Sequence, residues 1–250
     1  MADEQKFPSE IVDLPSGGKV YGENSPLKDG TIEIKYMTAK EEDILTSQNL
    51  IRKGIVLEKL LDSLILTKGV VSDDLLTGDR NAVLVSARVL AYGPEYECNI
   101  TNPNTDETIE HSFDLTSCEY KILPNDVDYS NNKFKFKLPG SGINITFKLL
   151  TGKDEKAVDA ELKSMSKIGA TREMTTRLRY IITSVDGKDD KSTINSFVDN
   201  MLSRDSLALR KEVQRIQPDI DLTQEVDFEG DAVKVDVPMT ANFFWPSDQL

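Results

Sequence analysis

Several residue types that build catalytic and metal sites are scarce in this sequence. Its 250 residues include two cysteines and one histidine. Cys98 and Cys118 lack CxxC spacing and are too few for a disulfide framework, so we expect two reduced thiols. Since His111 is the single histidine, any metal site or triad that needs two imidazoles is excluded. His111 also alternates with Ile109 and Phe113, which favours a packed histidine over a catalytic one.

Long apolar runs and the usual phosphate-binding and metalloprotease motifs are absent as well. No apolar stretch approaches the ~20 residues of a membrane helix, and the N-terminus has no apolar core behind a basic start, so we expect neither a membrane span nor a secretory signal. GxGxxG, GxxxxGK[ST] and HExxH do not occur. The Ser16-Gly17-Gly18-Lys19 fragment lacks the phosphate-loop spacing and predicts a turn.

A catalytic pair is also hard to assemble. Cys98 and His111 could face each other across a hairpin, but a hairpin alone supplies neither an activating base nor a pocket for an oxyanion. We therefore predict no enzymatic activity, no catalytic residues, no cofactor, no bound metal and no small-molecule substrate.

The charge balance is strongly acidic. Forty-three acidic residues against 30 basic ones give a formal net charge of -13. A surface this negative repels phosphate backbones and disfavours broad binding to nucleic acid. Two interpretations remain open: the charge keeps the protein soluble, or it steers the chain to a basic partner.

Two stretches of the chain resemble two later ones in the same order. Residues 32–42 (IEIKYMTAKEE) parallel residues 145–155 (ITFKLLTGKDE), and residues 75–82 parallel residues 201–208. A proline and an acidic residue follow the helix that each of the last two stretches begins. They are Pro94-Glu95 after residues 75–82 and Pro218-Asp219 after residues 201–208. This order predicts two related halves.

We place the N-terminal half at residues 1–124 and the C-terminal half at residues 134–250, joined by a polar linker. The first half is predicted to hold an extended arm, a strand, helices and a hairpin. The second is predicted to hold a hairpin, helices, a closing hairpin and an aromatic tail. The fold class is thus α+β, each half combining a short strand or hairpin, a bundle of three to four helices and a closing β-hairpin.

Local patterns support these elements. Thr38 stands three residues before Glu41 in a capping box, and Thr151 with Asp154 repeats the device, so a helix is expected after each. Alternating apolar residues predict a hairpin after the helices of the first half and a hairpin on each side of the helices of the second half. An apolar stripe predicts one helix over residues 174–185.

Two features are candidates for partner binding. Phe243, Phe244, Trp245 and Pro246 form an aromatic tail, which either packs back on the core or anchors a partner, because large aromatic side chains bury much area on binding.

Basic residues gather in one part of the second half. Arg172 and Arg179 are predicted to share a helix face in a group with Lys163, Lys167 and Arg177. This group is either a solvated face balanced by neighbouring acids or a docking patch for an acidic protein.

A family resemblance emerges from motifs in their order along the chain. They are DLPSGGKVY at residues 13–21, MTAKEE at 37–42, GDR at 78–80, Ala87-Arg88, YGPEY at 92–96, Pro218-Asp219 and FFWP at 243–246. Together they resemble the baseplate hub subunits and hub-assembly proteins of T4-like contractile-tailed phages over nearly the whole chain.

This resemblance implies a structural or assembly protein of a phage tail that contacts other baseplate and tail proteins, without nucleic acid or membrane partners. It implies a place in the tail baseplate of the virion after assembly in the host cytoplasm. Two roles stay open, a virion subunit of the hub and a transient hub assembly chaperone.

Some relatives carry a CPxC turn in the first hairpin and a cysteine pair in the last. Here Asn102-Pro103-Asn104 and residues 227–230 stand at those turns. A structural zinc site generally needs four Cys or His ligands, so we expect metal-free hairpins.

Overall fold

The computed structural model describes residues 8–166, 172–228, 230–239 and 241–244. The helices are α1 (Ala39–Thr46), α2 (Gln48–Lys53), α3 (Val56–Leu64), α4 (Thr77–Tyr92), α5 (Gly152–Ser166), α6 (Glu173–Ile181), α7 (Lys191–Asp199) and α8 (Ser203–Ile216). The strands are β1 (Ser9–Asp13), β2 (Thr31–Lys35), β3 (Glu95–Thr101), β4 (Thr108–Asp114), β5 (Phe134–Lys137), β6 (Asn144–Phe147), β7 (Ile182–Val185), β8 (Thr223–Phe228) and β9 (Asp231–Asp236). The predicted α+β class is confirmed.

The strands form small antiparallel sheets. β1 pairs with β2, β3 with β4 and β8 with β9, whereas β5, β6 and β7 form a three-stranded sheet in that order. The predicted hairpins are present. The helix predicted over residues 174–185 ends at Ile181, however, and residues 182–185 form β7 instead. Ile182 and Val185 pair with β6, and β-branched residues suit a strand once a partner edge is available.

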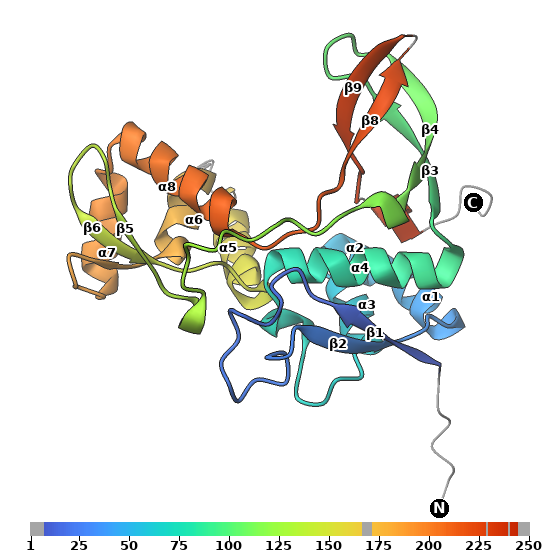
Figure 1. Cartoon of the computed structure of the whole chain (residues 1–250), viewed down its shortest axis with the longest axis horizontal. Coiled ribbons are helices and arrows are strands. Elements are labelled where there is room, and N and C mark those ends of the chain that lie inside the picture. The colour runs from blue at the N-terminus through green and yellow to red at the C-terminus, as the bar shows by residue number, and fades with distance from the viewer. Residues whose placement is uncertain (1–7, 167–171, 229, 240, 245–250) are drawn as a thin grey trace, which may run out of the picture.

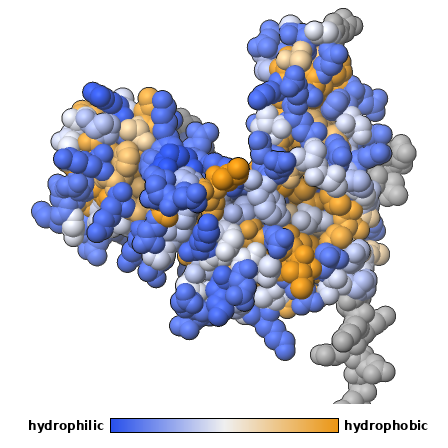
Figure 2. Space-filling model, in the orientation of Figure 1, coloured by the Kyte–Doolittle hydropathy of each residue, from blue (hydrophilic) through white to orange (hydrophobic). Residues whose placement is uncertain are grey.

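The elements gather in two lobes (Figure 1). The first lobe comprises β1 to α4 and both hairpins, β3–β4 and β8–β9, which lie side by side above α4. The second lobe comprises residues 124–216, with β5–β7 and α5–α8. Two connecting segments, residues 119–123 and 217–222, run between the lobes. Figure 2 shows a notch between the lobes with apolar surface beside it.

Each lobe has its own hydrophobic core. The core of the first lobe includes Val226, Phe228 and Val237, so the last hairpin of the predicted C-terminal half packs on the N-terminal half. The core of the second lobe is built mainly from β5 to α8 and also takes in Val20 and Leu76 of the first lobe. The boundaries at 124 and 134 stay a prediction, and the packing of the last hairpin does not follow them.

The two halves repeat the same local arrangement. Lys35, the last residue of β2, lies 2.6 Å from Glu41, and Lys148, directly after β6, lies 2.7 Å from Asp154. Each of these two acids also accepts a hydrogen bond from the backbone N–H of the threonine three residues earlier, at 3.0 and 3.2 Å. The chain then forms α1 in one half and α5 in the other. The capping boxes predicted from the sequence thus start equivalent helices.

The repeat continues through the next elements. The residue after α3, Ile65, bridges to Ile34 of β2, and the residue after α6, Ile182, pairs with Phe147 of β6. The same residues donate their N–H groups to Leu61 and Leu178, respectively, in the preceding helix. These contacts place α3 and α6 in equivalent positions.

In each half a buried aspartate of the last helix binds the turn that follows the first strand of that half. Asp79 of α4 accepts the N–H of Ser16 at 2.9 Å, and Asp205 of α8 accepts the N–H groups of Gly140 and Ser141 at 2.5 and 3.0 Å. Ser16 and Gly140 each follow a Leu-Pro pair. Both aspartates lie in the first turn of their helices, where the helix dipole favours a carboxylate.

Candidate functional site

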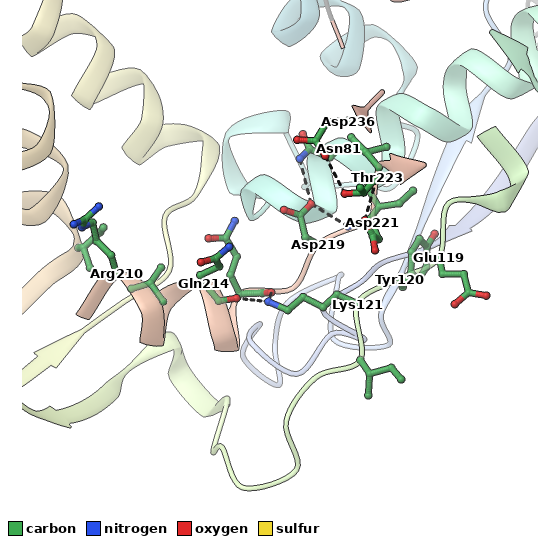
Figure 3. A pocket seen from close by; sticks show the side chains of 16 residues that line it. Asn81, Glu119, Tyr120, Lys121, Arg210, Gln214, Asp219, Asp221, Thr223 and Asp236 are labelled. Carbon is green, nitrogen blue, oxygen red and sulfur yellow. Dashed lines mark hydrogen bonds between the residues drawn. The ribbon is translucent and has the colours of Figure 1, made fainter. Parts of the chain in front are cut away.

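A hollow of about 970 Å³ lies where the two connecting segments run between the lobes (Figure 3). The segments hold each other as a short antiparallel pair. Tyr120 bridges to Ile220, the N–H of Lys121 donates to Asp219 at 2.9 Å, and the N–H of Asp221 donates to Glu119 at 2.7 Å. The hollow is therefore bounded by backbone that is already paired.

Side chains around this hollow bind other parts of the chain. The Lys121 ammonium donates to the carbonyl of Gln214, and at 3.2 Å to that of Gln217, both at the C-terminal end of α8. A cation is favoured there because helix carbonyls are unsatisfied and the dipole is negative. Asn81 of α4 donates to Asp219 at 3.2 Å, and Tyr120 donates to the carbonyl of Asp13 at 2.7 Å. These bonds tie both lobes to the connecting segments.

The electrostatics of the hollow fit that holding role. Burial lowers the pKa of Lys121 and raises the pKa of Tyr120. Hydrogen bonds from Thr223 lower the pKa of Asp221. Among the described residues that line the hollow there is no serine, cysteine or histidine to act as an activated nucleophile. In the described part of the chain, no group of three or more His, Cys, Asp or Glu side chains is arranged to hold a metal.

The most strongly perturbed tyrosine, Tyr21, lies at the junction of the lobes. It donates to Asp79 at 2.6 Å and accepts the N–H of Leu76 at 3.0 Å. Burial and the nearby carboxylate raise the pKa of Tyr21, and burial raises that of Asp79. Tyr21 therefore stays a protonated donor that stabilises the start of α4.

Comparison with known proteins identifies the family. Residues 8–245 match a family described as T4 bacteriophage base plate protein. The chain belongs to this family. No curated protein and no solved structure matches this chain. Among the described residues, no helix combines the length and the apolar character needed to cross a membrane.

In this base plate protein the two described rings of the aromatic tail pack inward. Phe243 and Phe244 are fully buried in the core of the first lobe, and Phe243 meets Tyr96 edge-on with ring centroids 5.0 Å apart. Buried Arg88 donates to the carbonyl of Phe243 at 2.8 Å. Of the two alternatives drawn from the sequence, packing on the core holds for these two rings, and they are not exposed anchors. Trp245 and Pro246 lie outside the described residues.

The basic group of the second half divides. Arg179 pairs with Asp199 at 2.6 Å, and Arg177 pairs with Glu155 at 3.0 Å, as expected for a face balanced by acids. Arg172 is exposed at the N-cap position of α6 rather than within the helix, beside a hollow of about 530 Å³. Lys167 lies outside the described residues. Among the described residues of the predicted group, Arg172 and Lys163 are exposed, whereas Arg177 and Arg179 are half-buried.

The hairpin pair Cys98 and His111 does face across β3 and β4. His111 packs edge-on against Phe113 with ring centroids 4.8 Å apart. Burial raises the pKa of Cys98, which favours the protonated thiol over the nucleophilic thiolate.

Sequence reasoning missed the hydrogen bonds from backbone N–H groups to Asp79 and Asp205, which we call the aspartate clasps. Asp79 lies 63 positions from Ser16 in sequence. The available signal was the repeat itself, since both aspartates fall in the pair of parallel stretches that start α4 and α8.

Proposed function

We propose that this chain is a structural component of the baseplate hub of a contractile phage tail and acts through protein–protein contacts. The observation that carries this proposal is the base plate family match, which spans both lobes. In the proposal the partners are other baseplate and tail proteins, and no reacting side chains, nucleic acid, membrane or small-molecule substrate are involved. The place of action is the tail baseplate of the virion, reached after assembly in the host cytoplasm.

Two features of the fold support a contact role. The lobes are joined through paired backbone and side-chain bonds around the connecting segments, which holds them in one orientation. Large apolar side chains also stay exposed on both lobes, among them Ile11 at 68% and Leu202 at 52% exposure. Exposed apolar area of this kind marks contact surfaces when it gathers in patches.

Fractionation of phage particles tests the proposal. Baseplates are isolated from purified virions and divided into hub and peripheral fractions. Each fraction, and lysate of infected cells, is analysed by quantitative mass spectrometry. A hub subunit co-purifies with the hub in fixed ratio to the other hub proteins. Recovery only in peripheral fractions would make the hub assignment wrong. Presence in lysate but absence from finished particles would instead support a transient hub assembly chaperone.

A further inference from the structure

One face of the first lobe is covered by the start of α5. Leu76 forms a backbone bridge with Thr151, and the N–H of Gly152 donates to Leu75 at 2.9 Å. A Cβ on Gly152 would lie only 2.7 Å from the carbonyl oxygen of Ser72, so the contact is close. As a result Leu76 is only 2% exposed and belongs to the core of the second lobe.

Charge pairing completes this contact. Lys156 of α5 lies 2.8 Å from Glu58 of α3 and 2.7 Å from Asp73. The start of α5 therefore brings a backbone N–H and a cation to a face built from α3, the segment before α4, and the N-cap of α4. We call this face the covered face.

The repeat places an equivalent face on the second lobe. Leu202 is the N-cap of α8 as Leu76 is of α4, and each accepts the N–H of the residue four positions later, at 3.0 and 2.9 Å. Because α6 is equivalent to α3, Met174 corresponds to Leu57 and Thr175 to Glu58, while Asp199 corresponds to Asp73. We call Arg172, Met174, Thr175, Asp199 and Leu202 the open face.

Within the part of the chain that the structure describes, no element packs over the two apolar side chains of the open face. Leu202 is 52% exposed and Met174 is 49% exposed. Their elements meet, because the hydroxyl of Ser206 in the first turn of α8 lies 3.8 Å from the sulfur of Met174. The hollow of about 530 Å³ noted above is lined by Arg172, Glu173, Met174, Thr175 and Asp199, and Glu173 is paired with Arg177 at 3.5 Å. Two apolar side chains thus stand exposed at the position where the first lobe is covered.

The chain also has an exposed equivalent of the start of α5, the segment that packs on the covered face. The start of α1 is equivalent to the start of α5, with Ala39 at the position of Gly152 and Asp43 at that of Lys156. Ala39, Lys40, Glu42 and Asp43 are exposed. Within the chain, the start of α5 therefore binds the covered face. The start of α1 and the open face have no such contact among the described residues.

We propose that the start of α1 of one copy docks on the open face of a second copy, head to tail, in the way that α5 docks on the covered face. The charges differ from those of the contact within the chain. Asp43 replaces Lys156 on the helix, while on the open face Thr175 replaces Glu58 and Asp199 is already paired with Arg179. Exposed Arg172 supplies the cation that would face Asp43. Such a contact joins two different surfaces, so it continues into a ring or a filament. The Cβ of Ala39 sets α1 slightly farther from its partner than α5, which makes this contact weaker than the one within the chain.

Two substitutions at exposed positions block one side each. Leu202→Arg removes the apolar group of the open face, and Ala39→Arg places a long charged side chain at the start of α1. Loss of an anchor at the centre of a contact weakens association about 10-fold or more. Ile122→Arg is the matched control, since Ile122 is 92% exposed on a connecting segment outside both surfaces. Circular dichroism melts of all three variants serve to check that each keeps the fold.

Sedimentation velocity over a concentration series reads the outcome. The unmodified full chain and Ile122→Arg are expected to self-associate with rising concentration, whereas Leu202→Arg and Ala39→Arg each stay monomeric. An equimolar mixture of the two blocked variants is expected to form a dimer and nothing larger, because one intact α1 start then meets one intact open face. Arg172→Asp is expected to weaken association, and adding Asp43→Arg to restore it.

A wild-type chain that stays monomeric at its highest soluble concentration overturns the proposal. So does a mixture of the blocked variants that stays monomeric while the wild type associates, since the contact then uses other surfaces. The proposal rests on the internal repeat and not on the hub assignment, so either can fail alone.

Discussion

The buried Glu41 network makes a pH-dependent contribution to stability. Glu41 is fully buried and accepts hydrogen bonds from Lys35 at 2.6 Å, Ser63 at 2.6 Å and the Thr38 hydroxyl at 2.7 Å. Burial raises the pKa of Glu41, but these bonds outweigh it and lower the pKa from 4.5 to about 2. The pKa in the folded state is thus below that in the unfolded chain, so the contribution is present above pH 4.5 and is lost as the pH falls toward 2.

The difference of the two pKa values sets the size of this contribution. At 1.36 kcal/mol for each pH unit, it amounts to about 3 kcal/mol. Glu41→Gln removes the charge at every pH and replaces the carboxylate that Lys35, Ser63 and Thr38 bind. We expect this variant to be less stable than the wild type by about 3 kcal/mol at pH 7, with the difference shrinking toward pH 2.

Urea unfolding at a series of pH values measures both chains. Asp43→Asn is the matched control, because Asp43 is exposed on the same helix and its removal should leave the pH dependence of the wild type in place. If the stability difference between wild type and Glu41→Gln stays constant from pH 7 down to pH 2.5, the pKa reasoning for this network is refuted.

Three further changes probe the core and the clasps. Asp205→Ala removes the buried carboxylate that accepts the N–H groups of Gly140 and Ser141 and should lower the free energy of unfolding by about 1.5–3 kcal/mol in urea titrations, as for hydrogen bonds to a charged group; an unchanged midpoint would show that these bonds contribute nothing. Gly152→Ala should speed proteolysis between the lobes, because the added Cβ meets Ser72, whereas Gly22→Ala meets nothing and should behave as wild type. Phe244→Ala should cost ~3–5 kcal/mol in thermal and urea unfolding, as for a buried ring, and a loss under 1 kcal/mol would contradict its place in the core.

The internal repeat connects these tests to assembly. Both halves use the same clasp and the same capped helix start, yet only the first lobe has its docking face covered. If the open face binds a second copy, its apolar side chains are explained by the same contact that joins the lobes. The hub assignment is tested separately by particle fractionation.

Much of the local structure could be predicted from neighbouring residues alone. The capping box of Thr38 and Glu41 starts α1 as expected, and alternating apolar residues formed the predicted hairpins. These features depend on contacts within a few positions of the chain, and so the sequence contains their physical cause. The helix predicted to reach Val185 failed for the opposite reason: residues 182–185 had a distant strand edge, β6, available for pairing.

The sequence by itself determined the capped helix starts, the hairpins and the repeat. It also determined a composition with few of the histidines and cysteines that catalytic sites use. Only the tertiary structure decided which repeated residues are buried. Leu76 and Leu202 occupy the same N-cap position, yet one is 2% and the other 52% exposed. Likewise, the sequence left open whether Phe243 packs on the core or is exposed. Its contacts with Tyr96 and Arg88 in the structure place it in the core. Burial depends on which distant elements meet in space, and that information does not lie in any local pattern.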